Sequence, residues 1–81
     1  MRKPVILITG ANGEMGHGLI HSLFEKTETD ILALDLEPLS KNIKHHVLDG
    51  VQGDILDVKL LEMLNTEYEI KAIYHLAALL S

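Results

Sequence analysis

The stretch Val5-Ile6-Leu7-Ile8-Thr9-Gly10-Ala11-Asn12-Gly13-Glu14-Met15-Gly16 decides the fold of this chain. A short apolar run is followed directly by Gly10, Gly13 and Gly16, which are spaced three residues apart. Beyond them, apolar side chains recur at the spacing of an amphipathic helix, at Met15, Leu19, Ile20, Leu23 and Phe24. A strand, a glycine turn and a helix in this order predict a phosphate-binding turn, because backbone N–H groups meet the positive end of the helix dipole there.

The rest of the chain continues the alternation of strands and helices. We expect helices over residues 14–26 and 58–68, and strands over residues 4–9, 31–36, 47–52 and 71–76. The link of about ten residues between the second and third strands is near the lower limit for a crossover, so we expect a loop or a single helical turn there. Gly18 lies inside the first helix and predicts a close approach of that helix to a strand.

This alternation predicts an α/β fold with a parallel sheet and right-handed crossovers. The doubly wound strand order 3-2-1-4 would place the two helices on opposite faces of the sheet. A doubly wound domain continues beyond its fourth strand, which would otherwise be an exposed edge. We therefore expect residues 1–81 to form the N-terminal half of such a domain, completed further along the chain or by a neighbouring copy.

Composition excludes several classes of function. The chain has no cysteine, which excludes disulfides and cysteine-ligated metals, and its net charge of −5 argues against a nucleic-acid partner. The apolar run after Arg2-Lys3 is too short for a signal peptide, and we find no run that could span a membrane. We expect a soluble, cytoplasmic protein with a hydrophobic fraction, 47%, that is ample for a core.

Polar groups around the glycine turn predict the parts of a dinucleotide site. Asn12 and the N–H groups of Glu14 and Met15 would face a pyrophosphate, with the Glu14 carboxylate turned away because two anions repel. Asp35 ends the second strand 19 residues after Gly16, close to the spacing of about 20 expected for the acid that binds the adenosine ribose. A carboxylate at that position favours NAD over NADP, whose 2′-phosphate it would repel.

The Asp54-Ile55 pair after the third strand has two interpretations. Asp54 could accept a hydrogen bond from the adenine amine while Ile55 covers the ring. Alternatively, Asp54 caps the turn that follows Gly53. The sequence does not decide between the adenine contact and the turn cap.

The histidines carry less information. His17 and His21 are four residues apart, a spacing found in metal sites, but with Glu25 they form a row that is more typical of a solvated face. We therefore predict no metal site. We expect His75 to support the turn after the fourth strand.

Four segments together resemble the extended short-chain dehydrogenase/reductases, also called NAD-dependent epimerase/dehydratases. The resemblance covers the entire chain and rests on Thr9–Gly16, Asp35, Gly53–Ile55 and His75–Ala78. It implies a Rossmann-type fold and an NAD cofactor whose pyrophosphate, ribose, adenine and nicotinamide ribose are contacted in turn by these segments. The implied cofactor-binding residues are Gly10, Asn12, Gly13, Glu14, Met15, Gly16, Asp35, Leu36, Asp54, Ile55, Leu76, Ala77 and Ala78.

Within that family, Tyr74–Ser81 is most similar to L-threonine 3-dehydrogenases of the short-chain type. The resemblance implies hydride transfer on a small hydroxyl-bearing substrate by an oxidoreductase or isomerase, and we expect a homodimer.

The family's catalytic Tyr-x-x-x-Lys pair is absent from residues 1–81, since Ala72 follows Tyr68 and Ala78 follows Tyr74 at the lysine position. We assign no catalytic residue here, and the alternative is a non-catalytic NAD-sensing or interaction module of the same fold.

Overall fold

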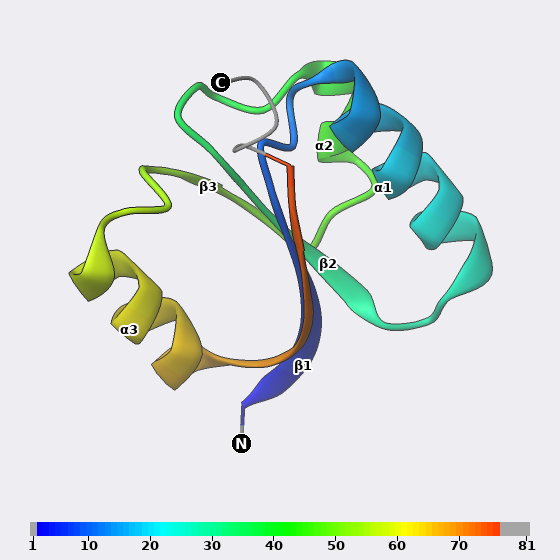
Figure 1. The fold of residues 1–81 in the computed structure, drawn as a ribbon. Coiled ribbons are helices and arrows are strands. Elements are labelled where there is room, and N and C mark those ends of the chain that lie inside the picture. The colour runs from blue at the N-terminus through cyan, green and yellow to red at the C-terminus, as the bar shows by residue number, and fades with distance from the viewer. Residues whose placement is uncertain (1, 77–81) are drawn as a thin grey trace.

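A parallel sheet flanked by helices on both faces forms the part of the chain that the computed structural model describes, residues 2–76 (Figure 1). Strands and helices alternate along these residues, as the hydrophobic periodicity predicts. The elements are β1 (Lys3–Thr9), α1 (Glu14–Lys26), β2 (Asp30–Asp35), α2 (Lys41–Lys44), β3 (Asp49–Gln52), α3 (Val58–Glu67) and β4 (Tyr68–His75).

The strands lie in the order β3-β2-β1-β4, and every neighbouring pair is parallel. This confirms the predicted α/β fold and the doubly wound order. Thr9 is opposite both Leu34 and His75, and Asp35 is opposite Gln52. The carboxyl ends of all four strands therefore meet at one edge of the sheet, which is where open α/β sheets bind their ligands.

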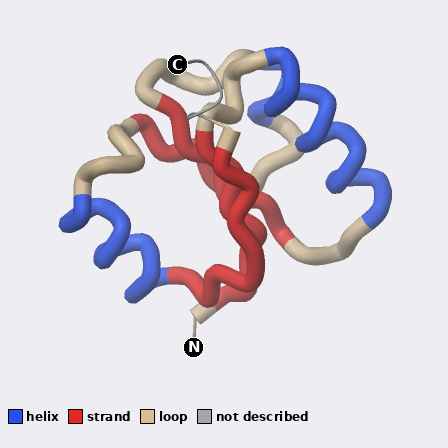
Figure 2. Tube along the Cα trace, viewed as in Figure 1, coloured by secondary structure: helices blue, strands red, loops and turns tan. Residues whose placement is uncertain are grey.

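Two hydrophobic clusters on opposite faces of the sheet hold the layers together. On one face, Ile8 of β1 packs in a cluster with Ile20 of α1 and Ile43 of α2. On the other face, Leu7 packs in a cluster with Leu64 of α3. Because consecutive residues of a strand point to opposite faces, β1 contributes to both clusters. Figures 1 and 2 show the same division, with α1 and α2 on one side of the sheet and α3 on the other.

Some boundaries differ from those expected. The connection between β2 and β3 contains only the four-residue helix α2, as predicted, but β3 begins at Asp49 rather than at residue 47. The larger difference is at β4, which begins at Tyr68 directly after α3. Tyr68 has an extended backbone, with φ −125° and ψ 151°, yet its N–H still bonds the Leu64 carbonyl. One residue thus ends the helix and starts the strand, so no separate turn is needed.

The expectation for Gly18 is wrong. A Cβ at Gly18 would meet no neighbouring atom within 4 Å, whereas a Cβ at Gly16 would overlap the backbone of Ala11. The close approach is therefore made by the last glycine of the turn. The apolar stripe of α1 is also buried only in its middle, because Met15 and Phe24 are 63% and 53% exposed.

Among the helices of residues 2–76, none combines the length and apolar character needed to span a bilayer.

Candidate functional site

The glycine turn folds back over the carboxyl ends of β1 and β2. Gly10 has φ 70°, in the left-handed region that favours glycine. Its N–H donates to the Leu34 carbonyl at 2.9 Å, and the Gly13 N–H donates to the Gly10 carbonyl at 3.3 Å. The turn is therefore tight, and it delivers the chain into α1 directly above the sheet edge.

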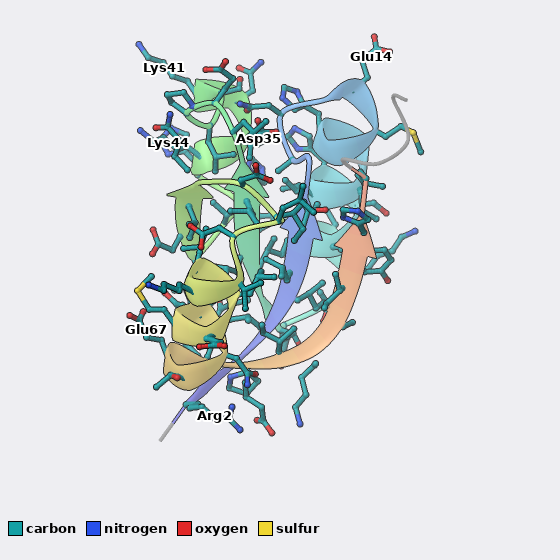
Figure 3. All side chains as sticks on the ribbon, turned by 60° about the vertical axis from the view of Figure 1, so that its left-hand side comes forward. Arg2, Glu14, Asp35, Lys41, Lys44 and Glu67 are labelled. Carbon is teal, nitrogen blue, oxygen red and sulfur yellow. The ribbon has the colours of Figure 1, made fainter. Side chains whose placement is uncertain are left out.

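The N-terminus of α1 differs from those of the other two helices described within residues 2–76. The Ser40 hydroxyl caps α2 by accepting from the Asn42 N–H, and the Asp57 carboxylate caps α3 by accepting from the Leu60 N–H. Within the described residues, no side chain caps α1, whose N-cap residue is Gly13. The first N–H groups of a helix have no intrahelical partner, so α1 presents unpaired donors and a positive dipole end. Figure 3 shows Glu14 pointing away from the sheet.

A cavity of about 600 Å³ lies at this edge, between the glycine turn, the end of β2 and the turn after β3. It brings together most of the residues that the sequence predicts for the cofactor. Those that line it are Gly10, Gly13, Glu14, Met15, Gly16, Asp35, Leu36, Asp54, Ile55 and Leu76.

Three predicted residues are not placed in the cavity. Ala77 and Ala78 lie outside the described residues. Asn12 is described, but its side chain turns toward the loop after β2, where its amide nitrogen donates to the Pro38 carbonyl at 2.7 Å. The prediction that the Asn12 side chain faces the pyrophosphate is therefore wrong for this conformation. Asn12 does lie in the glycine turn, as predicted. Only the tertiary structure shows that its side chain hydrogen-bonds to the backbone of the loop after β2.

Three further residues line the cavity that were not among the predicted cofactor-binding residues, namely Thr9, Leu34 and Gly53. Each immediately precedes a predicted site residue, and its position at or just after the carboxyl end of a strand is the signal that could have identified it. Thr9 is 1% exposed, and its hydroxyl lies 2.6 Å from Nδ1 of His75. This contact joins the ends of β1 and β4. The turn after β4, which His75 was expected to support, continues into residues outside those described.

Asp35 is held firmly at the sheet edge. One carboxylate oxygen accepts from the Asn12 N–H and the other from the Glu37 N–H, both at 3.0 Å. Figure 3 shows Asp35 between the carboxyl ends of the strands and α2. An ionised carboxylate has about four acceptor positions, so two remain after these backbone bonds. The group can therefore accept two further hydrogen bonds from hydroxyl groups.

Asp54 makes the contact expected for a turn cap. Its carboxylate accepts from the Leu56 N–H at 2.9 Å, and its carbonyl accepts from the Asp57 N–H at 3.0 Å. Of the two interpretations left open by the sequence, the structure supports the capping role. Asp54 and Ile55 still line the cavity, which leaves the adenine contact as a proposal.

The row formed by His17 and His21 faces the segment after α2 rather than solvent alone. The His21 ring meets His46 edge-on at a centroid distance of 4.6 Å, and His46 meets Phe24 at 4.4 Å. Nε2 of His17 is buried without a hydrogen-bond partner among the described residues. His21 and Glu25 are exposed, as expected of a solvated face, whereas His17 is half-buried. Within residues 2–76, no group of three or more histidine or carboxylate side chains is arranged to hold a metal ion.

Comparison with known proteins agrees with this geometry. A search of curated proteins finds no match to the chain. The profile of a family described as the NAD dependent epimerase/dehydratase family matches residues 6–81, a range that includes the glycine turn, Asp35 and the turn after β3. The chain belongs to the NAD-dependent epimerase/dehydratase family.

Proposed function

We propose that this chain forms the NAD-binding part of an enzyme that transfers hydride to or from a small hydroxyl-bearing substrate. Family membership implies a nicotinamide dinucleotide cofactor. The observation that carries the proposal is the convergence of the glycine turn, the uncapped N-terminus of α1 and Asp35 on one cavity of about 600 Å³. That volume is within the range of about 300–1,000 Å³ found for small-molecule sites.

The residues present fit the pyrophosphate of such a cofactor. The unpaired N–H groups at the start of α1 would bind phosphate oxygens, and the helix dipole would favour their negative charge. Gly10 and Gly16 support this role, because the turn needs a left-handed residue at Gly10 and a residue without Cβ at Gly16. Side chains at either position would push the turn away from the sheet edge.

The remaining contacts extend from β2 toward β4. Asp35 would bind the adenosine ribose through its two free acceptor positions. The half-buried Ile55 and the exposed Leu36, which both line the cavity, would cover the adenine ring, with Asp54 beside it. Leu76 follows β4 at the same edge, and we propose that Leu76, Ala77 and Ala78 contact the nicotinamide ribose.

Bound NAD would supply the hydride acceptor or donor. The residues described above bind and orient that cofactor, and no catalytic residue is assigned among residues 1–81 because the Tyr-x-x-x-Lys pair is absent from them.

Calorimetric titration of the protein with NAD and with NADP tests the proposal. We expect NAD to bind more tightly, because Asp35 would repel a 2′-phosphate. Asp35→Asn should weaken NAD binding and reduce the NAD/NADP preference. Asp30→Asn is the matched control, since Asp30 lies at the opposite end of β2, where its carboxylate pairs with Lys3 at 3.1 Å. Equal or tighter binding of NADP by the wild-type protein would contradict the ribose assignment.

Substrate class requires a separate assay. We propose L-threonine as the first substrate to test, because of the similarity of Tyr74–Ser81 to L-threonine 3-dehydrogenases, and nucleotide sugars as the second. Formation of NADH with threonine by the full protein would support the dehydrogenase. NAD binding by the full protein without turnover of either class would favour the non-catalytic NAD-sensing module. The homodimer stays a prediction that light scattering can test. The cytoplasmic location also stays a prediction.

A further inference from the structure

The Asn12 side chain joins the glycine turn to the loop after β2, residues 36–40. Its amide nitrogen donates to the carbonyls of Pro38 at 2.7 Å and Glu37 at 3.4 Å. Its amide oxygen accepts from the Ser40 N–H at 2.8 Å. Both ends of the amide are thus engaged by the backbone of one loop, and Asn12 is not among the residues that line the cavity.

The same two segments hold the Asp35 carboxylate. The Asn12 N–H occupies one oxygen and the Glu37 N–H occupies the other. Any movement of the loop relative to the glycine turn would therefore move one of these donors away from the carboxylate. The Asn12 side chain opposes such movement, because its amide hydrogen-bonds from the glycine turn to the backbone of Glu37 and Ser40 in the loop.

The first residue of the loop, Leu36, is held by a contact that does not involve Asn12. The Gln52 amide on β3 donates to the Leu36 carbonyl at 3.1 Å. Ser40 caps α2 through its hydroxyl while its N–H is held by Asn12. The loop is thus fixed at its beginning by β3 and at its end by the glycine turn.

We propose that Asn12 is a positioning residue that sets the preference for NAD over NADP, by fixing the loop at 36–40 and through it the Asp35 carboxylate. The inference rests on the proposed function of the site. This role differs from a pyrophosphate contact, because the Asn12 amide hydrogen-bonds to the loop. The proposed phosphate donors are instead the backbone N–H groups at the start of α1. Asn12 then acts on the ribose end of the cofactor.

The chemistry of the side chain makes the role specific. The position needs a donor facing two carbonyl oxygens and an acceptor facing one N–H, which asparagine supplies. In Asn12→Ala, the donor for the carbonyls of Glu37 and Pro38 and the acceptor for the Ser40 N–H are both lost. The loop is then released without a new charge near the place of a 2′-phosphate.

Asn12→Ala in the full protein, titrated with NAD and NADP by calorimetry, tests the effect on specificity. We expect NAD affinity to fall about tenfold, as weaker ribose hydrogen bonds to a less firmly held Asp35 would give, with a smaller loss for NADP, so that the preference narrows. Asn42→Ala is the control, because Asn42 is exposed on α2 and, within residues 2–76, contributes its backbone N–H and not its side chain to a bond. It removes the same kind of side chain outside the loop and should leave both affinities unchanged.

Amide hydrogen exchange in the cofactor-free protein tests the positioning directly. In Asn12→Ala, the Ser40 N–H loses its acceptor and the Glu37 N–H loses its fixed carboxylate, so both amides should exchange faster. The Gly53 N–H, which bonds the Asp35 carbonyl at 2.9 Å, should keep its protection and shows that the sheet is intact.

The outcomes separate the two proposals. Equal losses of NAD and NADP affinity in Asn12→Ala would mean that Asn12 acts on the pyrophosphate or on the fold, and would overturn the inference. Unchanged exchange at Ser40 and Glu37 in Asn12→Ala would also overturn it. A wild-type protein that binds neither cofactor would instead contradict the proposed function itself.

Discussion

At the scale of single residues, the two glycines of α1 have opposite physical roles. Gly16 is buried, and a Cβ there would overlap the Ala11 backbone. Gly18 is exposed two residues later, with open space where its Cβ would be. Helix propensity alone favours alanine over glycine at both positions by about 1 kcal/mol. Packing against the glycine turn therefore decides which substitution the fold accepts.

We predict opposite effects for the same substitution at these two positions. Gly18→Ala should raise the free energy of unfolding by about 1 kcal/mol. Gly16→Ala should lower it by roughly 1–3 kcal/mol, as overpacking against a backbone that cannot move aside does. Urea unfolding followed by circular dichroism measures both. Stabilisation by Gly16→Ala would contradict the close approach of α1 to Ala11.

Tyr68 gives a residue-scale prediction about pH. Burial raises the pKa of Tyr68 above its ordinary value of 10.0, and the negative charge of Asp49, which accepts from its hydroxyl at 3.4 Å, raises it further. The fold favours the neutral phenol, so this stability is present below pH 10 and is lost as the pH rises through the higher pKa of the folded state.

Thermal unfolding between pH 9 and pH 11 would measure that loss, and Tyr68→Phe should reduce it. An unaltered slope in Tyr68→Phe would show that other groups govern alkaline unfolding.

At the scale of elements, helix capping distinguishes the helix at the candidate site from the other two of the described residues. Asp57 caps α3 and Ser40 caps α2, whereas Gly13 leaves the N-terminus of α1 open. A side-chain cap occupies the N–H groups that a phosphate would need. Side-chain caps thus occupy the N-termini of α2 and α3, and the N-terminus of α1, which borders the cavity, has none among the described residues.

Removing the cap of α3 should therefore affect stability and not cofactor binding. Asp57→Ala should cost about 1 kcal/mol in the free energy of unfolding, and Asp57→Asn much less, because asparagine caps helices as well as aspartate does. Both variants should keep the wild-type affinity for NAD, measured by calorimetry. Loss of NAD affinity in Asp57→Asn would connect α3 to the site in a way that the geometry does not predict.

At the scale of the whole molecule, the two outer strands of the described sheet differ in how well they resist pairing with another chain. β3 has four residues, including Asp49 and Gly50, and such a short, charged edge resists pairing. β4 has eight residues, hydrogen-bonds only to β1, and exposes Ile73 and Tyr74 by 59% and 40%. Of the two edges, β4 is the one with the length and apolar surface to pair with another chain.

We predict that the 81-residue chain associates at high concentration through β4. Ile73→Lys should reduce that association, because a charge on an edge strand opposes pairing. Met63→Lys is the control, since Met63 is 49% exposed on α3, away from the edge. Sedimentation velocity over a range of concentrations measures the effect, and equal association of wild type and Ile73→Lys would contradict it.

Local sequence determined the elements of this protein and the position of its candidate site. The apolar run before Gly10, the helical spacing after it and the later alternation were enough to predict the sheet order and the edge where the strands end, because these depend on periodicity and on short connections. Asp35 could be placed at that edge because a strand end is a local feature.

Tertiary structure alone decided how the polar groups at that edge are used. The sequence could not show that the Asn12 amide would bond the loop at 36–40, that Gly16 rather than Gly18 would make the close contact, or that His21 would meet His46. Each of these contacts joins segments that are distant in sequence or depends on where a turn folds back. Periodicity specifies which face of an element is buried, but the partner of a polar side chain is fixed only when the elements are packed.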